Sequence, residues 1–343
     1  MNSLMRTAIA LTTVLALAGC VPVPEVPTPT PTHSATPTPT PTPMEAAPLT
    51  GEQFVAGTLS HGTFMAKIDN HPDARPQFGL NHTDIVFEEL VEGGLTRYVA
   101  IWHSDIPTEI GPVRSIRPMD PDIASPFKGV IAYSGGKAKF IYMMRDTQVE
   151  NFMHGLSKTA PYMFRTKQRA APHNVIVKAA QVITDKPNLV APDQAFTFAK
   201  PGEMATAYQF GAMRDVLHAR FSRGNEPSWV WDSEAGVYKR RQANGKWDTD
   251  ENGNVLTATN VIAQVVKESG EYGYIPKALV IGGGTAYVST GGKTFPVQWS
   301  KKDRNSFTTF TFQGGNVVKL APGNTWIELV PKSGKFWADA PAG

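Results

Sequence analysis

Arginines framed by glycine and proline are the residues of this sequence best suited to chemistry. Arg114 and Arg117 flank Ser115 in the segment IGPVRSIRP (110–118), where Gly111, Pro112 and Pro118 favour a loop or strand end over a helix. Planar guanidinium groups grip carboxylates or phosphates through paired hydrogen bonds and stay charged when partly buried. We therefore expect an anion-binding, arginine-rich cleft built from Arg97, Arg114, Ser115, Arg117, Arg169 and His173.

An alternative use of these arginines is internal. Asp84, Glu88 and Glu92 lie in the same stretch of chain and could neutralise the guanidinium groups to hold the domain together. The residue pattern leaves both interpretations open, because it does not show which carboxylates meet which arginines.

His173 and several carboxylates extend this candidate site. A histidine next to arginines could act as a general base or acid, or could be a structural histidine bonded to the backbone. Oxygen and imidazole groups suit a divalent ion, so Asp69, Asn70 and His71 could begin a metal site together with Asp84 or Glu88. The acidic or metal candidates are Asp69, Glu88 and Glu92; no cofactor is assigned, and a divalent metal remains the alternative.

The N-terminus has the features of a targeting sequence. In residues 1–20, Arg6 precedes an apolar run too short to span a bilayer, which is typical of a secretory signal peptide. The run ends in Leu-Ala-Gly-Cys, which resembles the bacterial lipobox, and Cys20 is the only cysteine of the chain. We expect a diacylglyceryl group on Cys20, usually joined by a further acyl chain such as palmitate, to anchor the protein in the cell membrane from the extracytoplasmic side.

The amino-acid composition limits the kinds of partner the protein can bind and indicates how the chain is organised. Residues 21–50 hold ten Pro and eight Thr, which predicts a disordered, extended tether. The 33 basic and 30 acidic residues give a net charge of +3, which argues against nucleic-acid binding. A single cysteine rules out a disulfide framework.

The sequence after the tether, residues 51–343, predicts an α+β protein with two domains. Residues 51–200 mix strand-like runs, among them 63–69, 85–91, 95–102 and 129–133, with helices at 137–145 and 175–184. Residues 201–343 show short strand-like runs between Asn-Gly and Gly-Gly turns, which predicts a mainly antiparallel β domain. The boundary is placed in the proline-rich stretch 186–201.

Several motifs together resemble one family. IDNHPDARPQFGL (68–80), EGGLTRY (92–98), IGPVRSIRP (110–118) and RAAPHN (169–174) are similar to the N-terminal domain of the YerB-type bacterial lipoproteins. NVIAQVV (260–266), Lys293, QWSKKDR (298–304) and PGNTWIELVP (322–331) are similar to the second domain of that family. The resemblance implies an envelope lipoprotein with two domains and no assigned activity.

Three functions fit these observations. The first is a binding or accessory module whose arginines recognise an anionic envelope glycan or lipid phosphate, or the carboxylates of a protein partner. The second is a phosphate-handling enzyme acting on polyprenyl-phosphate-linked or wall glycans, with Asp69 or Glu88 as base or metal ligand and Arg97, Arg114 and Arg117 neutralising phosphate. The third is a structural lipoprotein that docks a protein partner through the β domain.

Overall fold

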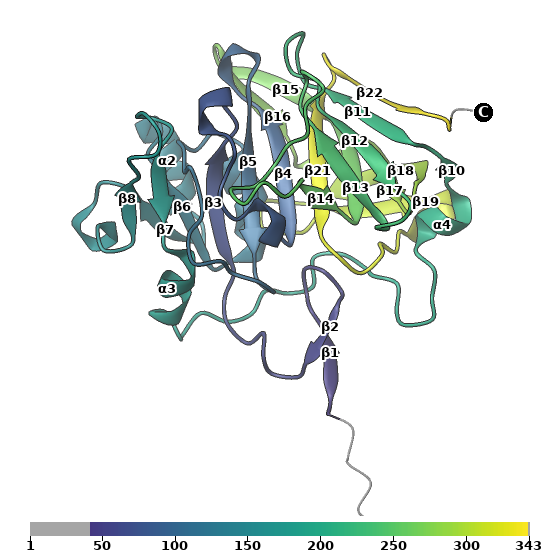
Figure 1. The fold of residues 1–343 in the computed structure, drawn as a ribbon, viewed down its shortest axis with the longest axis horizontal. Coiled ribbons are helices and arrows are strands. Elements are labelled where there is room, and N and C mark those ends of the chain that lie inside the picture. The colour runs from purple at the N-terminus through teal and green to yellow at the C-terminus, as the bar shows by residue number, and fades with distance from the viewer. Residues whose placement is uncertain (1–41, 342–343) are drawn as a thin grey trace, which may run out of the picture. The chain divides into compact units, whose positions relative to one another are not determined.

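Strands dominate the computed structural model, which describes residues 42–341 (Figure 1). The N-terminal half mixes strands with short helices, in the order β1 (Met44–Ala46), β2 (Gln53–Val55), β3 (Phe64–Asp69), η1 (Pro72–Ala74), β4 (Ile85–Leu90), η3 (Glu92–Gly94), β5 (Thr96–Trp102), α1 (Asp120–Ala124), β6 (Val130–Tyr133), α2 (Ala138–Arg145), β7 (Glu150–Met153), β8 (Met163–Arg165), β9 (Val175–Val177) and α3 (Ala179–Thr184). No helix of the described residues is long and apolar enough to cross a membrane.

The C-terminal half is almost entirely strands. Its elements are α4 (Thr206–Phe210), β10 (Ala212–Met213), β11 (Val216–Arg220), β12 (Ser228–Asp232), β13 (Val237–Arg241), β14 (Thr257–Ala258), β15 (Asn260–Tyr272), β16 (Ile275–Leu279), β17 (Gly282–Thr290), β18 (Lys293–Lys301), β19 (Thr309–Phe312), β20 (Asn316–Val317), β21 (Thr325–Pro331) and β22 (Lys335–Asp339).

One large sheet runs through both halves. Its path is β20-β19-β18-β17-β15-β21-β4-β5-β3-β6-β7, with β10 and β16 attached to β18 and β15. The late strand β21 makes the join, because it pairs in parallel with β15 on one side and with β4 on the other (Figure 1). The boundary expected near residue 200 thus lies on a chain segment between α3 and α4, while hydrogen bonds of the sheet connect the two halves elsewhere.

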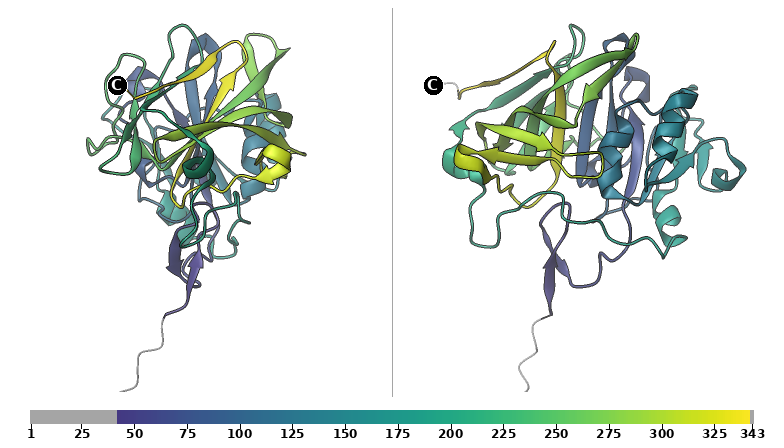
Figure 2. Two further views of the ribbon diagram at one scale, coloured as in Figure 1. Left: turned by 90° about the vertical axis from the view of Figure 1, so that its right-hand side faces the viewer. Right: turned by 180° about the vertical axis from the view of Figure 1, so that it is seen from behind.

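A second sheet and the helices cover the large sheet. The antiparallel sheet β14-β13-β12-β11-β22 belongs to the C-terminal half. Helices α2 and α3 lie beside the strands of the N-terminal half, and α4 lies beside β17 and β18 (Figure 1 and Figure 2). Side chains of each strand alternate between two apolar clusters, as the period of a β-strand requires. On β3, Met65 belongs to one cluster while Phe64, Ala66 and Ile68 belong to the other.

Several expected elements are present. The β4–β5 hairpin forms around Glu92-Gly93-Gly94, where Gly93 and Gly94 have φ angles of 71° and 74° that favour glycine. The strand at β6 and the helix at α2 also match their expected positions.

Other expectations need correction. The helix expected over 175–184 is instead strand β9 followed by the shorter α3, because the β-branched run Val175–Val177 pairs with β8. The glycines at 282–284 lie in β17 rather than in a turn. The tether expected to end at residue 50 ends earlier, since β1 pairs with β2 and Leu49 is fully buried. The signal peptide, Cys20 and residues 21–41 lie outside the described residues.

Candidate functional site

The candidate site forms where β3 ends. Asp69 is the last residue of β3 and pairs in register with Arg97 of β5, which in turn pairs with Glu89 of β4. Residues directly opposite each other in neighbouring strands project from the same face of a sheet. Asp69, Arg97 and Glu89 therefore share one face of the large sheet at this end.

The segment 110–118 crosses this end of β3 and brings in the other arginines. The backbone N–H of Asp69 donates to the carbonyl of Pro112 at 2.9 Å, and that of Arg114 donates to the carbonyl of Lys67 at 2.7 Å. Gly111 approaches β9 so closely that a side chain here would touch the backbone of Val175, which explains the glycine. The segment is thus held in place by its backbone, with Arg114 next to Asp69 and Arg117 next to Glu92.

Arg97, Arg114 and Arg117, hereafter the arginine cluster, lie close together, and two of them bind the carbonyl of Ser115. Arg97 Nη1 donates to this oxygen at 2.8 Å and Arg117 Nη1 at 3.2 Å. Arg114 Nε lies 3.0 Å from Asp69 Oδ2, and Arg117 Nε lies 2.7 Å from Glu92 Oε2. Ser115 contributes its backbone carbonyl in these contacts.

The electrostatics of the arginine cluster favour an additional negative charge. The three guanidinium groups form ion pairs with two carboxylates, Asp69 and Glu92, and in residues 42–341 no carboxylate lies within ion-pair distance of Arg97. Burial, together with the charges of Arg117 and Arg114, lowers the pKa of Arg97 to about 10. Burial alone would raise the pKa of Glu92, but the hydrogen bond from Arg117 and the neighbouring arginine charges lower it overall.

A buried group lies on the same face. Lys67 is fully buried and forms ion pairs with Glu89 and with Asp120, whose Oδ1 lies 2.8 Å from its Nζ. Burial and the charge of Asp120, opposed by Lys67, raise the pKa of Glu89 to about 8. The raised pKa of Glu89 reduces the negative charge that this buried group sets against the arginine cluster.

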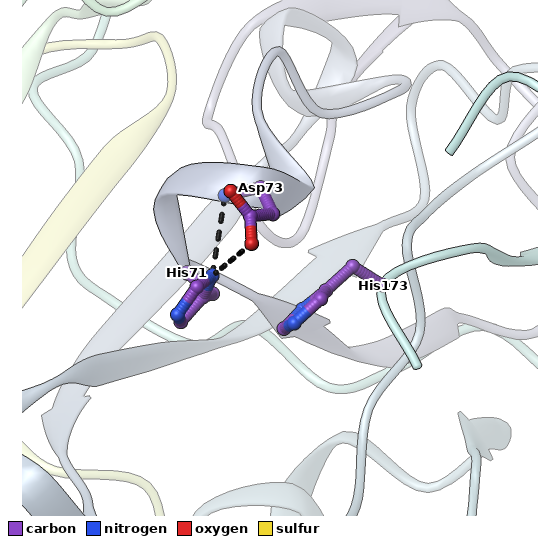
Figure 3. A group of neighbouring side chains, drawn as sticks. All are labelled: His71, Asp73 and His173. Atoms are coloured by element: carbon purple, nitrogen blue, oxygen red, sulfur yellow. Dashed lines mark hydrogen bonds and ion pairs between the residues drawn. The ribbon is translucent and has the colours of Figure 1, made fainter. Parts of the chain in front are cut away.

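His173 reaches Asp69 from the loop before β9. Its Nδ1 lies 2.6 Å from Asp69 Oδ2, and its ring stacks on His71 with centroids 4.4 Å apart (Figure 3). His71 precedes η1, and its Nδ1 accepts the backbone N–H of Asp73 at 3.2 Å. Asp69 thus joins the arginine cluster to a pair of histidines that come from separate loops.

Two predicted site residues lie elsewhere. Arg169 donates to the carbonyl of Pro76 and stacks on Phe78 at 5.0 Å, away from the arginine cluster. Glu88 lies on the opposite face of β4 from Glu89. The expected metal ligand set of Asp69, Asn70 and His71 with Asp84 or Glu88 is not assembled as one group. Asp84 binds Ser104 at the other end of β4, and Asn70 donates to Glu88 at 3.3 Å through its amide nitrogen, which is not a metal ligand.

Glu88 instead belongs to a buried network around Arg240 of β13, a residue that the sequence analysis missed. Arg240 is fully buried, with Nη2 2.6 Å from Glu88 Oε2, Nε 3.1 Å from Asp248 Oδ2 and Nη1 3.8 Å from Glu328 Oε1. Its guanidinium lies between 5.3 and 5.8 Å from the rings of Tyr98, Trp229 and Trp326. No local pattern marks it, since Glu88 is 152 positions away.

In the arginine cluster, Arg97 and Arg117 are almost buried and only Arg114 is appreciably exposed. A polar cleft of about 550 Å³ lies on the other side of the β4–β5 turn, lined by Asn70, Leu95, Arg223, Asn225 and Gln242 among others. The expected arginine-rich cleft is therefore a partly buried cluster, with Arg114 its most accessible member.

The fold and this site define a mainly β protein of two sequence regions joined in one sheet, with a conspicuous arginine cluster. Residues 49–189 match the N-terminal domain, and residues 217–327 the C-terminal domain, of the family described as "Protein of unknown function (DUF3048)". The chain belongs to this family, as the motifs indicated.

A curated relative and a solved structure agree with this assignment. The chain is 25% identical over 298 residues to "Putative lipoprotein YerB" of Bacillus subtilis (strain 168), which covers 83% of this chain and 86% of the relative. The crystal structure of YerB from Bacillus subtilis matches with a TM-score of 0.74 at 22% identity, over 85% of this chain and 99% of that chain. The relative's description agrees with the lipoprotein motif at Cys20.

Proposed function

We propose that this protein is a binding module, anchored through a lipid on Cys20 at the extracytoplasmic face of the cell membrane, that recognises an anionic group of an envelope component. The observation that carries the proposal is the arginine cluster: Arg97, Arg114 and Arg117 lie close together and form ion pairs with only two carboxylates. An anion at this surface would complete the charge balance.

Arg114 is the residue that would touch the ligand. Its side chain is 21% exposed, and in residues 42–341 no hydrogen bond uses its Nη atoms. Those atoms form a planar fork that matches two oxygens of a phosphate or carboxylate. Arg97 and Arg117 are more buried and would act mainly through their charge, which is weakly screened at partly buried positions.

A second candidate function is a phosphate-handling enzyme of the envelope. It is favoured by the Asp69–His173 pair at 2.6 Å, in which a carboxylate orients an imidazole next to the arginines. Glu88 has no part in it, because this carboxylate is committed to Arg240 on the other face of the sheet. Turnover of a phosphorylated glycan that is lost in His173→Gln, while binding persists, would favour this function over binding alone.

The binding proposal is tested with glucose 1-phosphate as a probe of a phosphorylated sugar and glucose as its uncharged counterpart. We expect the detergent-purified full chain to bind the phosphate ester and not glucose. Arg114→Gln should weaken binding at least tenfold, because a hydrogen bond to a charged group contributes about 1.5–3 kcal/mol.

The matched control is Arg223→Gln, an exposed arginine in the polar cleft. It should leave the affinity unchanged, and all variants should keep the wild-type melting temperature within a few degrees. If Arg223→Gln loses binding while Arg114→Gln keeps it, the ligand occupies the polar cleft and the proposal is wrong. Equal affinity in all variants would also contradict it.

A further inference from the structure

We propose that His71, Asp73 and His173 form a binding site for a divalent transition-metal ion, with Zn²⁺ as its representative. Each residue offers one ligand atom, and these atoms all lie within 4.8 Å of one another. The three side chains lie together although His173 is far from the other two in sequence (Figure 3).

Asp69 supports this assignment by binding the ring nitrogen of His173 that would not contact the metal. Its Oδ2 lies 2.6 Å from His173 Nδ1, which places the proton on Nδ1 and leaves the Nε2 lone pair available. A metal-ligating histidine nearly always donates its other ring N–H to a carboxylate or carbonyl, which fixes the ring and raises its basicity. Asp69 is 3% exposed and also contacts Arg114, so this support is fixed in position.

His71 and Asp73 form the movable part of the site. They share the turn that opens η1, and their side chains are 34% and 74% exposed. The rings of His71 and His173 are inclined by only 19°, whereas two imidazoles bound to one ion point their lone pairs at it. A rotation of His71, at the cost of its hydrogen bond from the Asp73 backbone, would bring its nitrogen and the Asp73 carboxylate onto an ion held by His173.

The donor set indicates the kind of ion. Two imidazoles and one carboxylate suit Zn²⁺ and its first-row neighbours, whereas Ca²⁺ and Mg²⁺ prefer oxygen ligands alone. Three protein ligands, two of them on an exposed turn, leave at least one coordination position for water or an oxygen of a ligand. If this ligand is the anion bound by the arginine cluster, that part of the inference rests on the proposed function. The metal site itself does not depend on the proposed function.

The test is a Zn²⁺ titration of the detergent-purified full chain after treatment with a chelator. We expect one Zn²⁺ per chain with micromolar or tighter affinity, and a Co²⁺ complex with the visible absorption of a nitrogen- and oxygen-ligated ion. His71→Ala and His173→Gln should each weaken Zn²⁺ binding at least tenfold. Asp69→Asn should weaken it by roughly ten- to a hundredfold, as expected for loss of a supporting carboxylate.

The matched control is His82→Ala. His82 also pairs with a carboxylate, since its Nδ1 lies 2.6 Å from Asp105 Oδ2, but within residues 42–341 it belongs to no group of three possible ligands. This variant should bind Zn²⁺ like the wild type, and melting without metal should show that each variant is folded. Wild-type affinity in His71→Ala and His173→Gln, or weak binding lost equally in His82→Ala, would overturn the metal site.

Arg114→Gln separates this proposal from the proposed function. This variant removes the anion contact but no metal ligand, so it should lose glucose 1-phosphate and keep Zn²⁺. Loss of Zn²⁺ binding in His71→Ala with glucose 1-phosphate binding intact would support the metal site independently. If wild-type protein binds glucose 1-phosphate and no Zn²⁺, the metal site alone is wrong.

Discussion

Replacing the buried Arg240 by methionine should sharply destabilise the protein. The Arg240 side chain projects from β13 and contacts β4 and β5 of the N-terminal half and β21 of the C-terminal half. It is the counter-charge of Glu88, Asp248 and Glu328. Methionine fills most of the volume but leaves these carboxylates without a cation. Breaking a buried ion pair from one side costs about 3–5 kcal/mol, a large fraction of the roughly 5–15 kcal/mol that stabilises a typical domain.

The loss should depend on pH in a defined direction. Burial, followed by the charge of Glu88, already raises the pKa of Glu328, and burial raises that of Asp248 against the charge of Arg240. Removing Arg240 raises the folded-state pKa values further above those of the unfolded chain. Folding of the variant must then take up protons, so its stability deficit should grow as the pH rises from 5.5 to 7.5.

Urea unfolding at these two pH values measures both effects. Arg241→Met is the matched control, because this neighbouring arginine is only half-buried and stacks on Trp247 at 4.2 Å. It should cost about 0.5–1 kcal/mol. The added substitutions Glu88→Gln and Glu328→Gln should restore part of the stability of Arg240→Met. A loss no larger than that of Arg241→Met, or one independent of pH, would refute the reasoning.

Further predictions concern single buried positions. Folding raises the pKa of Glu89 to about 8 and that of Asp84 to about 7. Each carboxyl group therefore contributes stability at low pH that is lost as the pH rises. Glu89→Gln and Asp84→Asn should each flatten the fall in melting temperature of the protein between pH 5 and 8. Gly129→Ala should cost more than about 2 kcal/mol in urea unfolding, because φ is +62° and the new methyl group would meet the backbone of Thr63. Gly93→Ala, with φ of +71° but open space, should cost about 1 kcal/mol; an equal loss at both positions would contradict the steric argument.

Local patterns were sufficient for local structure. The alternation in 85–102 around two glycines predicts the β4–β5 hairpin, and the helical spacing in 137–145 predicts α2. The same reasoning failed at 175–184, where the first three residues have the β-branched side chains of a strand and pair with β8. The order of the strands in the large sheet could not be predicted from the sequence. Strand β21 pairs in parallel with β4, more than 230 residues away, and no turn motif in the sequence indicates such a pairing.

The candidate site shows the same division. Arg114, Ser115 and Arg117 lie in one short segment, so their proximity follows from the sequence, and the β3–β5 register adds Arg97. Arg169 was assigned to the same group because of its charge, but its guanidinium stacks on Phe78. The burial of Arg240 depends on nearby Asp248 and on two carboxylates from distant strands, Glu88 and Glu328, which composition and spacing do not reveal.

Asp69 connects the two proposed sites and predicts a coupling between them. Its Oδ2 is shared by Arg114 Nε at 3.0 Å and His173 Nδ1 at 2.6 Å. A cation on His173 Nε2 makes Nδ1–H a stronger donor and draws the carboxylate charge toward His173. Arg114 then has more positive charge to offer an anion, so Zn²⁺ should tighten binding of glucose 1-phosphate.

Binding free energies are coupled reciprocally, so glucose 1-phosphate must tighten Zn²⁺ by the same factor. Couplings of this kind are typically about 1–3 kcal/mol, or roughly 5- to 150-fold in affinity. Titrating each ligand with and without the other measures the factor twice, and glucose serves as the uncharged control. His82→Ala should keep the coupling, whereas Asp69→Asn should reduce it toward one. If Zn²⁺ leaves the affinity of the wild type for glucose 1-phosphate unchanged, Asp69 does not transmit charge between the histidines and Arg114.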